Sequence, residues 1–422
     1  MHSWTSPSLT PLPASGLPLR LHDTRTGRVV PVVPLEPGRA RLYVCGITPY
    51  DATHLGHAAT YHATDLMRRA LRDSGLEVEV AQNITDVDDP LLERAARDGV
   101  DWRELADSQV ALFSEDMTAL RVVAPETYLS VSESMDGIIE TVRTLHERGR
   151  AYPVEAPDAA GPDWYLDLSL DGALGEVSGW DEAQMLEVFA ERGGDPDRPG
   201  KRGAFDPLLW RAEREGEPAW EAGELGRGRP GWHVECVRIA DEGLGLPFDV
   251  QAGGSDLVFP HHDLSAAHSV ALGRPFAALY AHAGMVALDG EKMSKSLGNL
   301  VFVHRLVRDG VDPMAIRLVL MAHHYRSDWE WSDDELTRAD ERLTAYRAAA
   351  ARGGSHPRTV AALRAALRED LDTPAALAAL DAWAAGKSPA AEEAAGSALP
   401  EDAAGDIAAA ADALFGLDLQ PA

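Results

Sequence analysis

The sequence predicts an α/β protein in which a doubly wound parallel sheet is split by an insertion and followed by a C-terminal helical bundle. Residues 41–46 form a buried apolar run that ends at glycine, residues 58–73 have helical periodicity, and residues 77–80 read as the next strand. A strand–helix–strand run of this kind opens a parallel sheet. Residues 125–228 interrupt the pattern, and a strand expected at 247–251 resumes it.

The other elements follow from local signals. Gly75 marks the end of the first helix, because glycine readily adopts the left-handed conformation that closes helices. We expect a short hairpin around residues 23–28, a helix at 134–148, a strand at 164–168, and helices in the Ala-rich C-terminal region. The expected segments are the N-terminal segment with the first half of a Rossmann-like core (1–124), an inserted connective domain (125–228), the second half of the core (229–285), the segment of the K-M-S-K-S sequence with stem-contact-like helices (286–335) and the helical bundle (336–422).

The composition describes a globular protein with a strongly acidic balance. The 422 residues are 45% hydrophobic and carry a formal net charge of −29. The sequence contains no apolar run long enough for a transmembrane helix and no secretory signal at its start. We therefore expect a cytoplasmic monomer without a membrane partner. A basic surface is usual in proteins that bind nucleic acids, so the charge balance, with Lys387 the one basic residue after Arg368, argues against extensive tRNA binding.

Two lysines and two histidines are candidates for phosphate chemistry. Only four of the 39 basic residues are lysines, and Lys292 and Lys295 lie together in K-M-S-K-S, residues 292–296. The mobile point charge of an ammonium group suits a phosphate. His54 and His57, in H-L-G-H, would share one face of a helix that starts there, at a terminus that favours anions. Either motif alone is equally consistent with solvent-exposed side chains that have no catalytic role. Together they predict phosphoryl or nucleotidyl transfer, which depends on positioned charge.

The two cysteines and one histidine form a candidate zinc site. Cys45 ends the first strand, Cys236 lies in P-G-W-H-V-E-C, and His261 lies in G-G-S-D-L-V-F-P-H-H. Thiolates and imidazole are ligands that zinc prefers. The three residues are far apart in the sequence, so their spacing alone leaves two buried, inert thiols as an alternative.

These motifs together resemble the two signatures of the class I aminoacyl-tRNA synthetases, H-x-G-H and K-M-S-K-S. The stretches around Cys45, Cys236 and His261 are similar to the C-G-x-T, G-W-H-x-E-C and G-G-S-D-L-x-F-P-H-H set of cysteinyl-tRNA synthetases. In that family a zinc ion binds the thiolate of the substrate cysteine. The resemblance implies a class I synthetase-like fold and a zinc ion held by these three residues. Zinc suits this selection, because it prefers sulfur to the hydroxyl of the nearly isosteric serine.

The chain departs from the cysteinyl-tRNA synthetase pattern in three places. Ser265 stands where those enzymes have a glutamate ligand, which leaves an open position at the metal. His268 would lie on the same helical face as His261 and is a candidate to replace that ligand. Pro90 stands in place of a lysine. The chain also stops about where the basic anticodon-binding region of the synthetases would begin.

These departures resemble the cysteinyl-tRNA synthetase paralogues that join cysteine to glucosaminyl-inositol in mycothiol biosynthesis. The sequence of residues 46–57, the run at 191–196 and the short tail carry this resemblance, which extends over residues 38–381.

The resemblance implies an AMP-forming ligase that makes an amide bond. ATP, with Mg²⁺, would activate L-cysteine as cysteinyl-adenylate and release diphosphate. The amine of 1D-myo-inositol 2-amino-2-deoxy-alpha-D-glucopyranoside would then take the cysteinyl group and release AMP. The residues implied as catalytic are His54, His57, Lys292 and Lys295, and those implied around ATP and the adenylate are Cys45, Gly46, Ile47, Thr48, Thr60, Asn83, Ile84, Thr85, Trp232, Gly254, Ser255, Asp256 and Val286.

Two other functions stay open on the sequence alone. One is a cysteinyl-tRNA synthetase with a truncated anticodon region, and the other is a non-catalytic sensor of cysteine or adenylate. The intact histidine and lysine motifs argue against a sensor. Sugar recognition leaves no local pattern, and the candidates for contact with the acceptor are Asp88, Asp89, Arg192 and Asp195.

Overall fold

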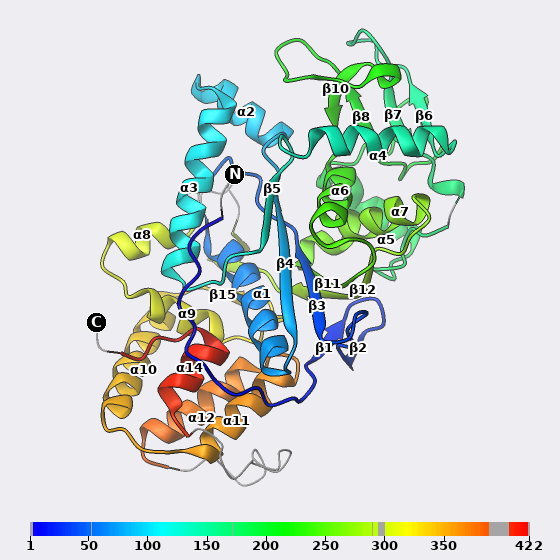
Figure 1. Ribbon diagram of the computed structural model, residues 1–422. Helices are drawn as coiled ribbons and strands as arrows, with labels where there is room; N and C mark the ends of the chain where they lie inside the picture. The colour runs from blue at the N-terminus through cyan, green and yellow to red at the C-terminus, as the bar shows by residue number, and fades with distance from the viewer. Residues whose placement is uncertain are drawn as a thin grey trace.

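A five-stranded parallel sheet lies at the centre of the computed structural model, which describes residues 3–51, 53–170, 172–288, 290–293, 300–387 and 405–420. In Figure 1 the inserted antiparallel sheet lies at one end of the molecule and the C-terminal helices at the other. The strand order is β12-β11-β3-β4-β5, and every pairing is parallel. The strands are β3 (Arg39–Val44), β4 (Glu77–Ile84), β5 (Thr127–Ser130), β11 (Phe248–Gly254) and β12 (Ala277–Ala283).

The strand order confirms the doubly wound α/β fold that the sequence predicts. From β3 the chain first builds the sheet outward through β4 and β5 and later returns to the other side of β3 with β11 and β12. The point between β3 and β11 is therefore the topological switch point, where folds of this kind bind ligands beyond the strand ends. Every residue of β11 is buried, as expected of a parallel strand covered on both faces.

The first helix, α1 (Leu55–Asp73), begins at the switch point. His54 caps its N-terminus: the side chain accepts a hydrogen bond from the backbone N–H of Gly56. The helix starts three residues before the expected position because of this cap. It ends before Gly75, whose φ of +88° is the left-handed conformation that the sequence predicts there.

The strand β5 lies within residues 125–228 but belongs to the parallel sheet. Its four residues pair with β4, from Ala81 opposite Thr127 to Ile84 opposite Ser130. A parallel pairing needs a crossover connection, and two helices provide it: α2 (Asp89–Asp98), capped by Asp88, and α3 (Trp102–Ala119), capped by Asp101.

The insertion forms a second, antiparallel sheet with strand order β6-β7-β8-β10-β9. The helix α4 precedes it, and α5 lies between its second and third strands. The elements are α4 (Met135–Glu147), β6 (Ala151–Val154), β7 (Asp163–Leu166), the short helix η1 (Leu168–Leu170), α5 (Glu182–Phe189), η2 (Ala190–Arg192), β8 (Leu208–Ala212), β9 (Trp220–Glu221), η3 (Gly223–Leu225) and β10 (Arg227–Pro230).

After the insertion the chain re-enters the core and then forms the C-terminal helices. No described helix is both long and apolar enough to span a membrane. The remaining elements are the hairpin β1 (Arg20–Asp23) and β2 (Arg28–Pro31), then α6 (Trp232–Leu244), η4 (Ser255–Leu257), the π-helical turn η5 (Val258–His262), α7 (Asp263–Ala271), β13 (Val286–Leu288), β14 (Glu291–Lys292), α8 (Val303–Arg308), α9 (Pro313–Met321), β15 (Trp329–Glu330), α10 (Asp333–Ala351), α11 (Pro357–Arg368), α12 (Thr373–Ala384) and α14 (Ile407–Phe415).

A buried arginine links α1 to the C-terminal helices. Arg317, in α9, is fully buried. Its Nε donates to the carbonyl of Phe415 at 2.5 Å, its Nη1 donates to that of Leu120 at 2.6 Å, and its Nη2 donates to the carboxylate of Asp65 in α1. Burial alone would raise the pKa of Asp65, but the guanidinium groups of Arg69 and Arg317 outweigh it and hold that pKa well below its usual range.

Candidate active site

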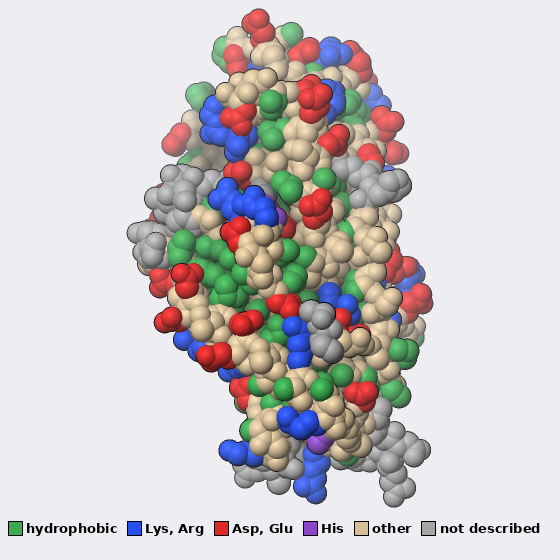
Figure 2. Space-filling view, turned by 90° about the vertical axis from the view of Figure 1, so that its left-hand side faces the viewer, with side chains coloured by type: hydrophobic (Ala, Val, Ile, Leu, Met, Phe, Trp, Pro, Cys, Tyr) green, Lys and Arg blue, Asp and Glu red, His purple; other side chains and the backbone are tan. Residues whose placement is uncertain are grey.

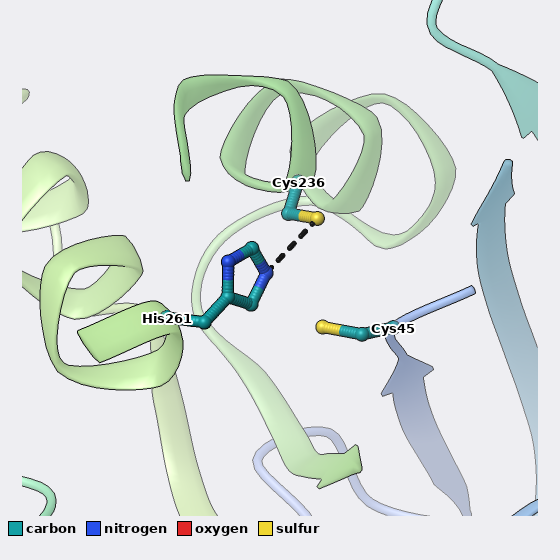
Figure 3. A group of neighbouring side chains, drawn as sticks. All are labelled: Cys45, Cys236 and His261. Atoms are coloured by element: carbon teal, nitrogen blue, oxygen red, sulfur yellow. Dashed lines mark hydrogen bonds between the residues drawn. The ribbon is translucent and has the colours of Figure 1, made fainter. Parts of the chain in front are cut away.

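Three soft donors converge at the switch point of the sheet. Cys45 directly follows β3, Cys236 lies in α6, and His261 lies in η5, which follows β11. Their ligand atoms all lie within 4.8 Å of one another, and Nε2 of His261 is 3.2 Å from Sγ of Cys236 (Figure 3). All three side chains are buried. Residues separated by about two hundred positions in the sequence therefore form one donor group.

The chemistry of this donor group fits a metal ion. Both cysteines are free thiols. The hydrogen bond with Cys45, together with burial, raises the pKa of Cys236 well above its usual range, because a buried thiolate needs a compensating positive charge. A divalent cation supplies that charge and displaces the thiol protons. Two thiolates and one imidazole are three of the four ligands of a tetrahedral site and leave one position for another ligand.

Of the two residues at issue for the fourth position, His268 is not part of the donor group that the described residues form. Ser265 is buried in α7, and its hydroxyl has no hydrogen-bond partner within the described part of the chain. His268 lies one turn further on, and its Nδ1 is 2.5 Å from the carbonyl oxygen of Leu264. Burial lowers the pKa of His268 to about 4, so that its ring is neutral.

A chain of polar contacts runs from Cys45 through His262 and His282 to Thr24. Nε2 of His262 lies 3.3 Å from Sγ of Cys45, and its Nδ1 lies 2.7 Å from Nε2 of His282. Nδ1 of His282 in turn lies 2.7 Å from the hydroxyl of Thr24. Burial lowers the pKa of His282 to about 3. Sequence reasoning did not find these residues, although the second histidine of the H-H pair was a signal for His262.

A cavity of about 530 Å³, here called the inner cavity, lies against the donor group. Residues of the loop after β3, the first turns of α1, the end of β11 and the strand β13 form its wall. The lining residues are Cys45, Gly46, Ile47, Thr48, Tyr50, His54, Gly56, His57, Thr60, Tyr61, Gly254, Asp256, Leu257, Gly284, Met285, Val286 and Met293.

The two histidines of H-L-G-H lie at the helix N-terminus that faces the inner cavity. Their rings stack, with centroids 3.9 Å apart and planes inclined by 28°. Nδ1 of His54 accepts a hydrogen bond from the backbone N–H of Gly56 at 3.1 Å. The dipole of a helix N-terminus attracts anions, and imidazole N–H groups can donate hydrogen bonds to a phosphate. The arrangement can therefore stabilise negative charge on a phosphate bound in the inner cavity.

The residues implied around the adenylate fall into two groups. Cys45, Gly46, Ile47, Thr48, Thr60, Gly254, Asp256 and Val286 line the inner cavity, and Ser255 follows Gly254 at the start of η4. Asn83, Ile84 and Thr85 are instead buried at the end of β4, and Trp232 packs on His261 with ring centroids 4.2 Å apart.

Asn83 holds in place the loop after β3, which forms part of the wall of the inner cavity. Its Oδ1 accepts hydrogen bonds from the backbone N–H of Gly46 at 2.7 Å and from the hydroxyl of Tyr43 at 3.0 Å, and its Nδ2 donates to the hydroxyl of Thr85. A Cβ atom at residue 46 would lie 1.6 Å from the backbone oxygen of Asn83. Only glycine therefore lets the loop after β3 lie this close to β4.

The lysines of the K-M-S-K-S sequence are at the edge of what the structure describes. Lys295 lies outside the described residues. Lys292 ends β14, where its backbone pairs with Ala287 of β13, and its side chain also lies outside the description. Met293, the next residue, is buried and lines the inner cavity. The start of this sequence is thus beside the inner cavity.

A second cavity of about 780 Å³, here called the outer cavity, adjoins the inner one. The two cavities share Thr48, Tyr50, Asp256 and Leu257 in their walls. The outer cavity lies between the core and the insertion. Its other lining residues are Asp88, Asp89, Pro90, Tyr165, Phe189, Glu191, Arg192, Gly193, Gly194, Asp195, Arg198, Pro207, Leu208, Arg211, Arg229, Pro230, Gly231, Trp232, His233, Glu235 and Pro260.

Three of the four sequence candidates for acceptor binding are engaged with protein groups. Nη1 of Arg192 donates to the carbonyl oxygens of Asp256 and Phe259, at 2.9 and 2.5 Å. The carboxylate of Asp195 accepts hydrogen bonds from Lys201 and Tyr165, and that of Asp89 pairs with Arg229. These contacts hold the insertion and the core around the outer cavity.

Asp88 and Glu235 are two carboxylates of the outer cavity that form no ion pair among the described residues. Oδ1 of Asp88 accepts a hydrogen bond from the backbone N–H of Asp89 at 2.9 Å, and its Oδ2 lies 3.4 Å from the hydroxyl of Thr48. Burial and the charge of Asp89 raise the pKa of Asp88 to about 6. Glu235 is 1% exposed, and its Oε2 has no hydrogen-bond partner in the described part of the chain. Sequence reasoning named Asp88 but missed Glu235, which its place beside Cys236 could have indicated.

The fold and the two motifs define a class I tRNA synthetase-like protein. The family described as tRNA synthetases class I (C) catalytic domain matches residues 31–341, and the chain belongs to this family.

Curated relatives match the whole chain. The protein is similar to a Brachybacterium faecium protein named L-cysteine:1D-myo-inositol 2-amino-2-deoxy-alpha-D-glucopyranoside ligase, with 79% identity over 420 residues and 100% of both chains covered. It is also similar to a Kineococcus radiotolerans protein of the same name, with 59% identity over 91% of this chain and 93% of the relative.

Solved class I synthetases share the fold at low sequence identity. The Mycobacterium tuberculosis methionyl-tRNA synthetase in complex with methionyl-adenylate superimposes with a TM-score of 0.60 and 18% identity, over 82% of this chain and 81% of that chain. The LeuRS of an Agrobacterium radiobacter LeuRS–tRNA–LeuAMS complex gives a TM-score of 0.62 at 12% identity, over 91% and 84% of the two chains.

Proposed function

We propose that the protein is an AMP-forming ligase that activates L-cysteine with ATP and joins it to the amine of 1D-myo-inositol 2-amino-2-deoxy-alpha-D-glucopyranoside. The observation that carries this proposal is the donor group of Cys45, Cys236 and His261, whose member Cys45 lines the same cavity as His54 and His57. The 79% identity with a full-length relative of this name supports the choice of both substrates.

The inner cavity is the proposed site of cysteine activation. A zinc ion held by Cys45, Cys236 and His261 would bind the substrate through its sulfur and so select cysteine over serine. The cysteine carboxylate attacks the α-phosphate of ATP, the bond between the α and β phosphates breaks, and diphosphate leaves. His54, His57 and the N-terminus of α1 stabilise the charge that grows on the α-phosphate, and Lys292 and Lys295 do so on the leaving diphosphate.

The outer cavity is the proposed site of the sugar acceptor. It shares four wall residues with the inner cavity, so an amine bound there is next to the acyl carbon of the adenylate. Its lining of carboxylates, guanidinium groups and backbone suits the hydroxyl groups of a pseudodisaccharide. Attack by the amine forms the amide bond, and the bond to the phosphate oxygen breaks to release AMP.

Surface charge supports a small acceptor rather than tRNA. Figure 2 shows one face on which Lys and Arg side chains are interspersed with Asp and Glu and form no continuous basic field among the described residues. The formal net charge of −29 points the same way. Two free thiols suit a reducing compartment, and we propose a cytoplasmic monomer. Its domain division follows the five expected segments, except that β5 (Thr127–Ser130) belongs to the core sheet.

The choice of acceptor tests the proposed function. The protein, cysteine and ATP are incubated with glucosaminyl-inositol or with tRNA, and AMP release and the amide product are measured. We expect AMP release and amide with the sugar alone. AMP release that depends on tRNA alone would instead assign a cysteinyl-tRNA synthetase, and absence of cysteine-dependent ATP–diphosphate exchange would indicate a sensor.

Replacing Lys295 with alanine is expected to slow adenylate formation by about 100-fold or more, the loss usual when one charge-stabilising donor is removed. The charge that Lys295 meets appears mainly in the transition state, so the affinity for cysteine should change much less. The exchange of diphosphate with ATP measures the rate, and equilibrium dialysis measures cysteine binding. An unchanged exchange rate would contradict the proposed role, and Lys387→Ala is the matched control.

A further inference from the structure

The acceptor amine raises a protonation problem that the activation site does not solve. An aliphatic amine is largely an ammonium ion at neutral pH and must lose a proton before it can attack an acyl carbon. A base within reach of the amine therefore belongs to the transfer step. The imidazoles of His54 and His57 line the inner cavity, so a base for the acceptor amine is expected in the outer cavity.

Asp88 has the position that this role requires. Its carboxylate lines the outer cavity and lies 3.4 Å from the hydroxyl of Thr48, which lines both cavities. The side chain is only partly buried, and Oδ1 makes the single backbone hydrogen bond that caps α2. Oδ2 is therefore directed to the place where the two cavities meet.

Glu235 is a second, independent sign of a cationic ligand at this place. Its side chain comes from α6, on the other side of the cavity, and is 1% exposed. Its Oε2 has no hydrogen-bond partner among the described residues. Asp88 and Glu235 both line the outer cavity. A buried carboxylate oxygen without a partner is costly, and an ammonium group bound between Asp88 and Glu235 would satisfy it.

We propose that Asp88 is the general base of the transfer step, at a subsite where Asp88 and Glu235 bind the ammonium group of the acceptor. This inference rests on the proposed function. The ammonium group gives one proton to Asp88, and the free amine attacks the acyl carbon of cysteinyl-adenylate. The new C–N bond forms, the bond between the acyl carbon and the phosphate oxygen breaks, and the departing AMP takes the second proton of the nitrogen. Asp88 then returns its proton to water.

The charged groups around Asp88 suit a base that works near neutral pH. Burial and Asp89, its neighbour in α2, raise the pKa of Asp88 to about 6, and Arg229 from β10 lowers it in part. Tyr50, from the loop after β3, and Glu235, from α6, line the same cavity as Asp88. Asp88 is thus ionised above about pH 6 and still basic enough to accept a proton. Transfer should fall as the pH drops through this value, because the protonated carboxyl cannot act as a base.

The variant Asp88→Asn tests this assignment. Asparagine caps helices as well as aspartate does, so α2 is retained while the base is lost. Two products are measured with the full-length protein: the amide with glucosaminyl-inositol and the hydroxamate with hydroxylamine, a nucleophile that is largely neutral at neutral pH. We expect the ratio of amide to hydroxamate to fall by about 100-fold or more, and to recover in part at alkaline pH, where free amine is available.

The pH profile and two control variants complete the test. The acid limb near pH 6 should be absent from Asp88→Asn. It should move to lower pH in Asp89→Asn, because a negative charge that raises the pKa of Asp88 is gone. Asp98→Asn, at the far end of α2, should keep the wild-type profile. A wild-type amide-to-hydroxamate ratio and acid limb in Asp88→Asn would overturn the assignment of the base alone. Hydroxamate without any amide in the wild-type protein would overturn the proposed function and this inference with it.

Discussion

Replacing His261 with alanine is expected to abolish metal binding and cysteine activation together. His261 supplies the one imidazole of a donor group whose other members are Cys45 and Cys236. Loss of a residue that merely supports a ligand typically costs 10–100-fold, so loss of the ligand itself should lower kcat/KM for cysteine by more than about 100-fold. Metal content is measured by elemental analysis, and activation by cysteine-dependent exchange of diphosphate with ATP.

Ser265→Ala is the matched control for this variant. Ser265 is buried one helical turn from His261, at the position of a glutamate ligand in cysteinyl-tRNA synthetases. A neutral hydroxyl is a poor zinc ligand, so its removal should leave the metal content unchanged. Metal-free His261→Ala protein with full exchange activity would refute the metal assignment. Loss of metal from Ser265→Ala would add Ser265 to the ligands.

Replacing Arg317 with alanine is expected to lower the free energy of unfolding by about 3–5 kcal/mol, the range for removal of one partner from a buried ion pair. The substitution removes one of the two guanidinium groups that pair with Asp65, and it leaves the carbonyl oxygens of Leu120 and Phe415 without the Arg317 donor. These groups belong to α1, the end of α3 and α14. Denaturant unfolding followed by circular dichroism gives the difference in free energy.

An exposed arginine provides the comparison for Arg317. Arg338 in α10 pairs with Glu335, but its side chain is 55% exposed. Exposed pairs of this kind contribute little to stability, so Arg338→Ala should unfold almost like the wild-type protein. Equal losses of unfolding free energy in the two variants would show that the buried network around Arg317 stabilises the fold no more than an exposed ion pair does. Because α1 carries His54 and His57 at its other end, Arg317→Ala should also slow adenylate formation.

The parts of the fold that local sequence determines were predictable. The strands β3 and β4 and the helix α1 have apolar runs, helical periodicity and a closing glycine within a few residues. The assignment of β5 was not predictable in this way. It has only four residues, and its partner β4 is more than forty residues away in the sequence, so nothing local tells whether it pairs with the core or with the insertion.

The site was predictable where a resemblance supplied what spacing could not. Cys45, Cys236 and His261 came from a resemblance to a family, and the structure brings them together. The roles of Asn83 and Thr85 were harder to predict from the sequence. Successive side chains of a strand point to opposite faces, so the sequence does not tell which of them lies toward the cavity. The placement of Gly46 against β4 shows that Asn83 holds the loop after β3. The outer cavity arises between the insertion and the core, so its lining has no sequence signature.

The origin of the three metal-binding side chains along the chain has a consequence for assembly of the protein. One thiol comes from the half-sheet made before the insertion, and the other thiol and the imidazole come from the half made after it. An ion bound by all three would link the two halves of the sheet. Part of its binding free energy would therefore contribute to the free energy of folding. A chelator would then lower the stability of the fold as well as the enzymatic activity. Cysteine selection and fold stability would depend on the same ion.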